Sequence, residues 1–130
     1  MESKFKYRVL KSSWGIAIDV TASFIFDTPT PQAMKITDNI YLAFEGFTLP
    51  EEHSLLVAKG MQMMADHISD GAIHLPVTVQ LTELWFNPCD FQPCGIPWAV
   101  AGWIANELDI KAPFVNITFD KIANRYVYQT

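Results

Sequence analysis

A turn and the start of a helix are encoded in the stretch Gly46-Phe47-Thr48-Leu49-Pro50-Glu51-Glu52-His53-Ser54-Leu55-Leu56-Val57-Ala58-Lys59-Gly60. Pro50 stands where proline is tolerated in a first helical turn, and the two glutamates after it match the positive end of the helix dipole. The pattern predicts a helix that ends at Asp70-Gly71. Gly60 would cost this helix about 1 kcal/mol relative to alanine, so we expect a close contact with a sheet there.

Helical spacing also predicts which side of this helix is buried. The expected buried stripe consists of Leu56, Gly60, Met63, Met64 and His67.

Strand-like segments surround the helix, because they alternate polar with apolar residues or are rich in β-branched ones. The expected strands cover residues 4–10, 14–26, 40–44 and 74–86, a second helix covers 98–108, and a terminal hairpin covers 114–128. This order of elements predicts an α+β fold, with a mixed sheet and about two helices packed on one face. At 130 residues, the chain is expected to form a single domain, 1–130.

Three segments together resemble domain IV of elongation factor G, over roughly residues 14–108. They are Trp14-Gly15, the stretch quoted above, and Leu75-Pro76-Val77-Thr78-Val79-Gln80-Leu81. In that family an aromatic-glycine pair opens a strand, a proline-led helix ends in a lysine-glycine pair, and a strand of alternating valines follows. The resemblance implies the same α+β arrangement for this chain.

The family also carries a loop that enters the decoding site of the small ribosomal subunit. That loop has a tyrosine-histidine pair followed by an aspartate, and the matching positions here are Phe86, Asn87 and Asp90. Asn87 stands in place of the histidine. The phosphate-binding motif of a GTPase is absent from the sequence, so no GTP is expected to bind.

Charge and hydropathy limit the classes of partner. The net charge is −5, and no lysine or arginine occurs between Lys59 and Lys111. Because nucleic-acid affinity rests on cations that neutralise phosphates, the acidic central half disfavours a ribosomal RNA contact. No apolar run reaches the length that spans a bilayer, and the N-terminal residues do not resemble a signal peptide. We therefore expect a cytoplasmic protein without membrane contact.

The residues that could carry catalysis or bind a metal are few. Cys89 and Cys94 are the only cysteines, and the histidines are His53, His67 and His74. A structural zinc site needs four ligands, usually as two paired clusters, which this spacing does not provide. We predict no catalytic residue, no metal and no cofactor. A thiol-dependent hydrolase or redox protein that uses one of the cysteines stays open as an alternative.

The segment 84–98 is rich in aromatic residues and prolines. Prolines stiffen a loop and lower the entropy lost on binding, and tryptophan is a favoured anchor at interface centres. The predicted binding residues are Trp85, Phe86, Asn87, Asp90, Phe91 and Trp98. The other interpretation is that these aromatic side chains fold back over the core.

These observations favour a non-enzymatic protein-binding module, such as a neutralising or regulatory partner of another protein. The partner would be another protein or a second copy of the chain, held through the 84–98 segment. The alternative that follows from the resemblance is a translation-associated factor that contacts the ribosomal decoding site.

Overall fold

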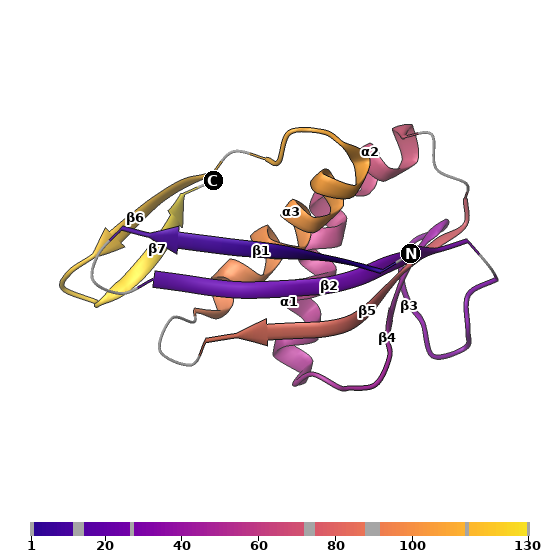
Figure 1. Cartoon of the computed structure of the whole chain (residues 1–130), viewed down its shortest axis with the longest axis horizontal. Coiled ribbons are helices and arrows are strands. Elements are labelled where there is room, and N and C mark those ends of the chain that lie inside the picture. The colour runs from indigo at the N-terminus through magenta and orange to yellow at the C-terminus, as the bar shows by residue number, and fades with distance from the viewer. Residues whose placement is uncertain are drawn as a thin grey trace.

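The computed structural model describes residues 2–11, 15–26, 28–71, 75–87, 92–113 and 115–129. Five strands form the main sheet in the order β1-β2-β5-β4-β3 (Figure 1). They are β1 (Ser3–Leu10), β2 (Gly15–Ile25), β3 (Met34–Thr37), β4 (Ile40–Phe44) and β5 (Val77–Phe86). β4 and β5 pair in parallel, and the other pairs are antiparallel. The predicted α+β fold with a mixed sheet is confirmed.

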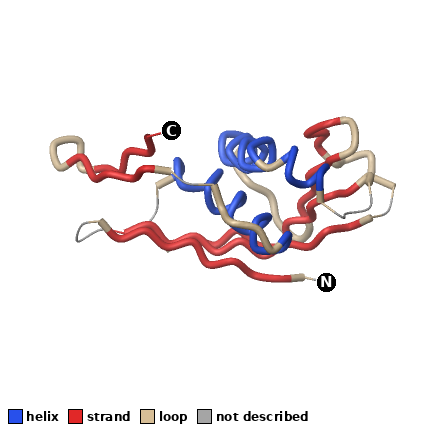
Figure 2. Tube along the Cα trace, turned by 90° about the horizontal axis from the view of Figure 1, so that it is seen from above, coloured by secondary structure: helices blue, strands red, loops and turns tan. Residues whose placement is uncertain are grey.

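The helices lie on one face of this sheet (Figure 2). They are α1 (Glu51–Met63), the short α2 (Ala65–Asp70), the 3-10 turn η1 (Pro93–Gly95) and α3 (Ile96–Leu108). A second, two-stranded sheet consists of β6 (Asn116–Asp120) and β7 (Arg125–Gln129), which pair where the sequence places the terminal hairpin. This hairpin lies in the same layer as the helices, near one end of the main sheet (Figures 1 and 2).

The core fills the space between the helices and the main sheet. Alternate residues of β2 point into it, and Ile16, Ile18 and Val20 are completely or almost completely buried. Trp103 of α3 is the largest fully buried side chain, and its indole N–H donates a hydrogen bond to the Ser3 carbonyl at 3.1 Å. α3 is therefore fixed to the edge strand β1 as well as to the sheet face.

The contact made by Gly60 differs from the expected one. A Cβ atom at this position would lie 2.5 Å from the Pro97 carbonyl oxygen and 2.9 Å from the Val100 Cβ. Gly60 therefore permits a close approach between α1 and α3, and the prediction of a helix-to-sheet contact there was wrong. The reason is that α3 crosses α1 at its glycine, which the sequence of α1 alone does not reveal.

The expected buried stripe was also partly wrong. The helix does not run unbroken to Asp70, because α1 ends at Met63 and α2 begins after Met64. His67 is exposed, while Leu56 and Met63 are half-buried. The buried apolar residues of α1, α2 and the Met64 link between them are Val57, Ala58, Met61, Met64 and Ile68. No helix in the described ranges is long and apolar enough to cross a membrane.

Candidate functional site

Trp85 lies on the open face of the main sheet, opposite the helices. Its neighbours in β5, Leu84 and Phe86, both pack against the core, so the alternation of a strand directs Trp85 to the other face. Its side chain is 44% exposed. It stands beside Asp19 in the strand register.

Two ion pairs lie on the open face, while Lys6 on the same side of β1 has no acidic partner within 4.0 Å among the described residues. Arg8 forms an ion pair with Asp19 at 2.8 Å, and Lys4 forms one with Glu83 at 3.2 Å. These pairs reduce the net charge that the face presents to a nucleic-acid backbone.

The other predicted binding residues that the structure describes lie at two separate places. Phe86 ends β5 and is half-buried against the core, and the Asn87 main-chain N–H donates to the Ala17 carbonyl at 3.2 Å. Asp90 and Phe91 fall outside the described residues. Trp98 lies in the first turn of α3, on the helix side of the sheet, and its ring stacks on Tyr128 of β7 with centroids 6.0 Å apart. The structure thus places Trp85 and Trp98 on different faces of the molecule.

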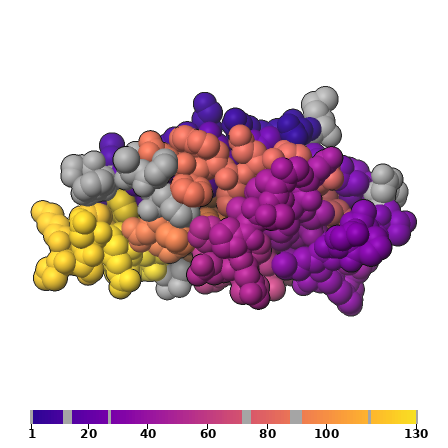
Figure 3. Space-filling model, turned by 90° about the horizontal axis from the view of Figure 1, so that it is seen from below, coloured from indigo at the N-terminus to yellow at the C-terminus, as the bar shows by residue number. Residues whose placement is uncertain are grey.

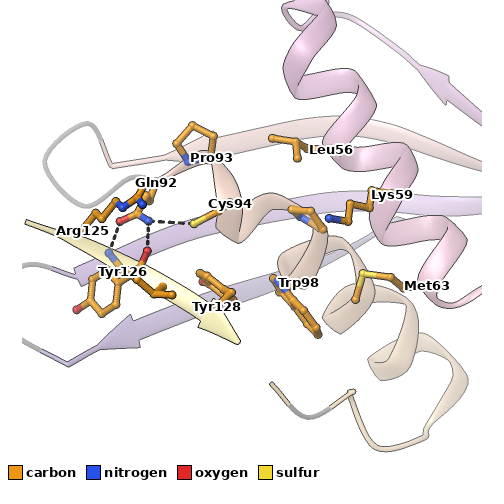
Figure 4. A pocket seen from close by; sticks show the side chains of 12 residues that line it. Leu56, Lys59, Met63, Gln92, Pro93, Cys94, Trp98, Arg125, Tyr126 and Tyr128 are labelled. Carbon is orange, nitrogen blue, oxygen red and sulfur yellow. Dashed lines mark hydrogen bonds between the residues drawn. The ribbon is translucent and has the colours of Figure 1, made fainter. Parts of the chain in front are cut away.

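A groove of about 710 Å³ lies beside Trp98. One wall is α1, the other is β7, and η1 with the start of α3 lies between them (Figures 3 and 4). Its lining residues are Leu56, Lys59, Met63, Gln92, Pro93, Cys94, Pro97, Trp98, Arg125, Tyr126, Val127 and Tyr128. We call this feature the α1–β7 groove.

Gln92 fixes β7 to the rest of the molecule. Its side-chain N–H₂ donates to the Tyr126 carbonyl at 2.6 Å, and its side-chain oxygen accepts from the Tyr126 N–H at 2.7 Å (Figure 4). The same amide nitrogen lies 3.0 Å from the Cys94 sulfur. Because both main-chain groups of Tyr126 are satisfied in this way, the hairpin is held in a defined position next to η1.

Two tyrosine hydroxyls form the second attachment of the hairpin. The Tyr7 and Tyr128 hydroxyls lie 2.9 Å apart and share a hydrogen bond. A Cβ at Gly95 would lie 3.1 Å from the Tyr128 hydroxyl, so this glycine makes room for the pair. The Tyr126 hydroxyl also accepts a hydrogen bond from the Lys11 N–H at 2.8 Å.

Three groups that can lose a proton lie next to the groove, and the pKa of each is raised: Tyr7, Tyr128 and Cys94. Burial raises the pKa of Tyr128, and the hydrogen bond with Tyr7 raises it further. Burial raises the pKa of Tyr7, against a smaller lowering by its bond to Tyr128. Burial also raises the pKa of the Cys94 thiol, with smaller opposing effects that include the Gln92 hydrogen bond. At neutral pH these three groups therefore keep their protons, which disfavours a thiolate nucleophile at Cys94.

The groove carries two cations on opposite sides. Lys59 projects from α1, and Arg125 begins β7 (Figure 4). Both residues are exposed, and neither has an acidic partner within 4.0 Å among the residues that the structure describes. The groove therefore combines apolar walls with positive charge, although the whole chain is acidic.

Metal and thiol chemistry find little support in the described ranges. These ranges contain no group of three or more His, Cys, Asp or Glu side chains that could hold a metal ion. Cys94 is a free thiol at the groove. Cys89 and His74, which the sequence offered as further candidates, lie outside the described residues.

Sequence reasoning found Trp98 but missed the other walls of the groove. The spacing of Leu56, Lys59 and Met63 is helical, yet it predicted burial for Leu56 and Met63 rather than a shared rim. On β7, Tyr126 and Tyr128 share one face of a strand, which was a signal for a second packed surface. No protein-family model matches the chain, and a search of curated proteins found no match.

Proposed function

We propose that this chain is a non-enzymatic, cytoplasmic protein-binding module that holds a partner protein in the α1–β7 groove. The observation that carries the proposal is the half-buried Trp98 in an apolar groove between two cations. Tryptophan in a partly desolvated recess is a typical centre of binding energy, and the surrounding apolar residues exclude water from it. A neutralising or regulatory role follows from such binding when the covered surface is the active surface of the partner.

The polar groups of the groove favour a protein over a small molecule. Small-molecule sites use a few precisely placed polar groups to fix the orientation of the ligand. Here the Gln92 amide is bonded to Tyr126, and the Tyr128 hydroxyl is bonded to Tyr7. The Gln92 amide and the Tyr128 hydroxyl are therefore engaged in holding the hairpin, whereas the apolar walls and the two cations, Lys59 and Arg125, stay available to a partner.

The acid-base properties of the groove support a binding role rather than catalysis. The pKa values of Cys94 and Tyr128 are raised by burial, so neither group supplies a nucleophile or base at neutral pH. The translation-associated alternative rests on the resemblance to elongation factor G domain IV. On the open face, the pairing of Arg8 and Lys4 with carboxylates weakens its support.

The proposal is tested by affinity capture from native lysate with the whole chain as bait. The informative variant is Leu56→Ser, because Leu56 lines the groove. The matched control is Leu55→Ser, since Leu55 is the preceding residue, is 57% exposed, and does not line the groove. Thermal unfolding is measured for both variants to check that each is folded.

We expect one partner protein to be captured by the unmodified chain and by Leu55→Ser, and to be reduced with Leu56→Ser. Equal capture by both variants would contradict binding in the groove. Capture of ribosomal proteins as a group, lost after nuclease treatment, would replace this function with the translation-associated one.

A further inference from the structure

The edge of β7 that faces away from β6 carries main-chain hydrogen-bonding groups. The N–H and C=O of Tyr126 bond to the Gln92 side chain, so both point away from β6. In an antiparallel pair, residues alternate between those that bond across the pair and those that point outward. The register places Phe119 opposite Tyr126 and Ile117 opposite Tyr128, without a bulge. The N–H and C=O of Tyr128 therefore point outward as well.

These outward groups of Tyr128 are available to a ligand. By this alternation the Tyr128 main-chain N–H and C=O do not bond to β6, and within the described ranges no turn, loop or side-chain partner is found for them. Tyr128 is half-buried and lines the α1–β7 groove together with Val127. An unpaired strand edge of this kind is a template for another strand.

Gln92 shows which chemical group fits this edge. Its side-chain amide accepts from the Tyr126 N–H and donates to the Tyr126 carbonyl, as the main chain of a neighbouring strand would. The edge thus already binds one amide at Tyr126. The next outward position along the strand is Tyr128.

We propose that the α1–β7 groove binds its partner by strand addition, with an extended acidic segment of the partner pairing with Tyr128 on the β7 edge. This inference rests on the proposed function and states how the partner is held. Recognition by an added strand takes affinity from main-chain bonds and specificity from alternate side chains. Lys59 and Arg125 select carboxylate side chains on the segment, and Leu56, Met63 and Trp98 contact its apolar side chains.

The first part of the test uses peptides selected from a random library displayed on phage, with the whole chain immobilised. We expect the selected peptides to alternate acidic with apolar residues. Lys59→Glu and Arg125→Glu should each weaken their binding about tenfold, which corresponds to ~1.4 kcal/mol. The control is Lys121→Glu, an exposed lysine in the turn between β6 and β7 that does not line the groove; its binding should be unchanged.

The second part measures amide hydrogen exchange by NMR with and without a selected peptide. The Tyr128 amide should exchange fast in the free chain and slow at least about tenfold when the peptide is bound. The amides of Tyr126, bonded to Gln92, and Val127, which pairs with Thr118, should be protected in both samples and serve as internal controls. A selected peptide methylated at its main-chain nitrogens should not bind.

If a selected peptide binds without slowing hydrogen exchange at the Tyr128 amide, strand addition is wrong. The capture experiment described above then still decides whether the groove binds a partner protein. A library that yields no enriched peptide would also overturn strand addition. Protection of Tyr128 in the free chain, together with a dimer mass in light scattering, would assign the edge to a second copy and also overturn the proposal.

Discussion

The hydroxyl groups of Tyr7 and Tyr128 lie 2.9 Å apart, and their hydrogen bond joins the edge strand β1 to the terminal hairpin. This bond and the Gln92–Tyr126 bonds hold β7 in place. Since β7 is one wall of the α1–β7 groove, the groove exists only while the hairpin is docked. The stability of the docked hairpin is therefore directly linked to the binding site.

Alkaline pH should weaken this docking. Burial raises the pKa of both Tyr7 and Tyr128 above the ordinary value of about 10, so the folded chain keeps protons that the unfolded chain loses. Their contribution to the free energy of unfolding is complete below about pH 10 and is lost as the pH rises above it. Cys94 contributes with the same sign, because burial also raises its pKa. Urea unfolding at a series of alkaline pH values measures the decline.

The Tyr7→Phe, Tyr128→Phe double variant isolates the two hydroxyls from other alkaline effects. Its free energy of unfolding should decline less steeply with pH than that of the unmodified chain. Tyr41→Phe removes a tyrosine from β4, outside this pair, and should keep the full slope. Equal slopes for all three proteins would show that the tyrosine pair is not the source.

Gln92→Ala should loosen the hairpin. The substitution leaves the N–H and C=O of Tyr126 without their side-chain partners, which costs about 1–3 kcal/mol for part-buried groups. We expect faster hydrogen exchange at the Tyr126 amide and a lower urea midpoint. Gln62→Ala, at an exposed position on α1 that does not line the groove, is the control. An unchanged Tyr126 exchange rate in Gln92→Ala would contradict the role given to Gln92.

Gly60→Ala should destabilise the fold. The added Cβ would lie 2.5 Å from the Pro97 carbonyl oxygen, a main-chain atom that can move only if α1 and α3 separate. We expect a net loss of about 1–3 kcal/mol in urea unfolding, despite the better helix propensity of alanine. Gly102→Ala is the comparison, because its Cβ would meet the Phe5 ring, a side chain that can turn. A Gly60→Ala chain as stable as the unmodified one would refute the close helix contact.

The two tryptophans of the 84–98 segment should differ in their effect on partner binding. Trp98→Ala removes a groove residue and should weaken the affinity for the captured partner about tenfold or more. Trp85→Ala removes an exposed residue from the open face and should leave the affinity within about twofold. Isothermal titration calorimetry with the purified partner measures both. A larger loss of affinity in Trp85→Ala than in Trp98→Ala would show that the partner binds the open face of the sheet instead.

The elements with regular patterns could be predicted from the sequence. The alternation in β1 and the apolar run of β4 predicted bounds close to the observed ones, and Pro50 marked the start of α1. β3 was not predicted, because a four-residue strand that contains Lys35 and Thr37 shows no clear periodicity. The break at Met64 was missed since the apolar pattern continues across it into α2.

The groove could not be predicted in the same way. Its walls, α1 and β7, are far apart in the sequence, and contacts such as the bonds from Gln92 and Tyr7 to the hairpin bring them together. The sequence did contain the information that separates Trp85 from Trp98. Leu84 and Phe86 flank Trp85 in a strand and both face the core, so Trp85 must face the other way.

The most direct test of the groove function is photo-crosslinking in living cells with a benzoylphenylalanine at position 56 or at position 55. Leu56 lines the groove, whereas Leu55 is exposed beside it on the same helix. We expect one crosslinked partner from position 56 and little or none from position 55. Equal crosslinking from both positions, or crosslinking from position 55 alone, would contradict the claim that the partner occupies the α1–β7 groove.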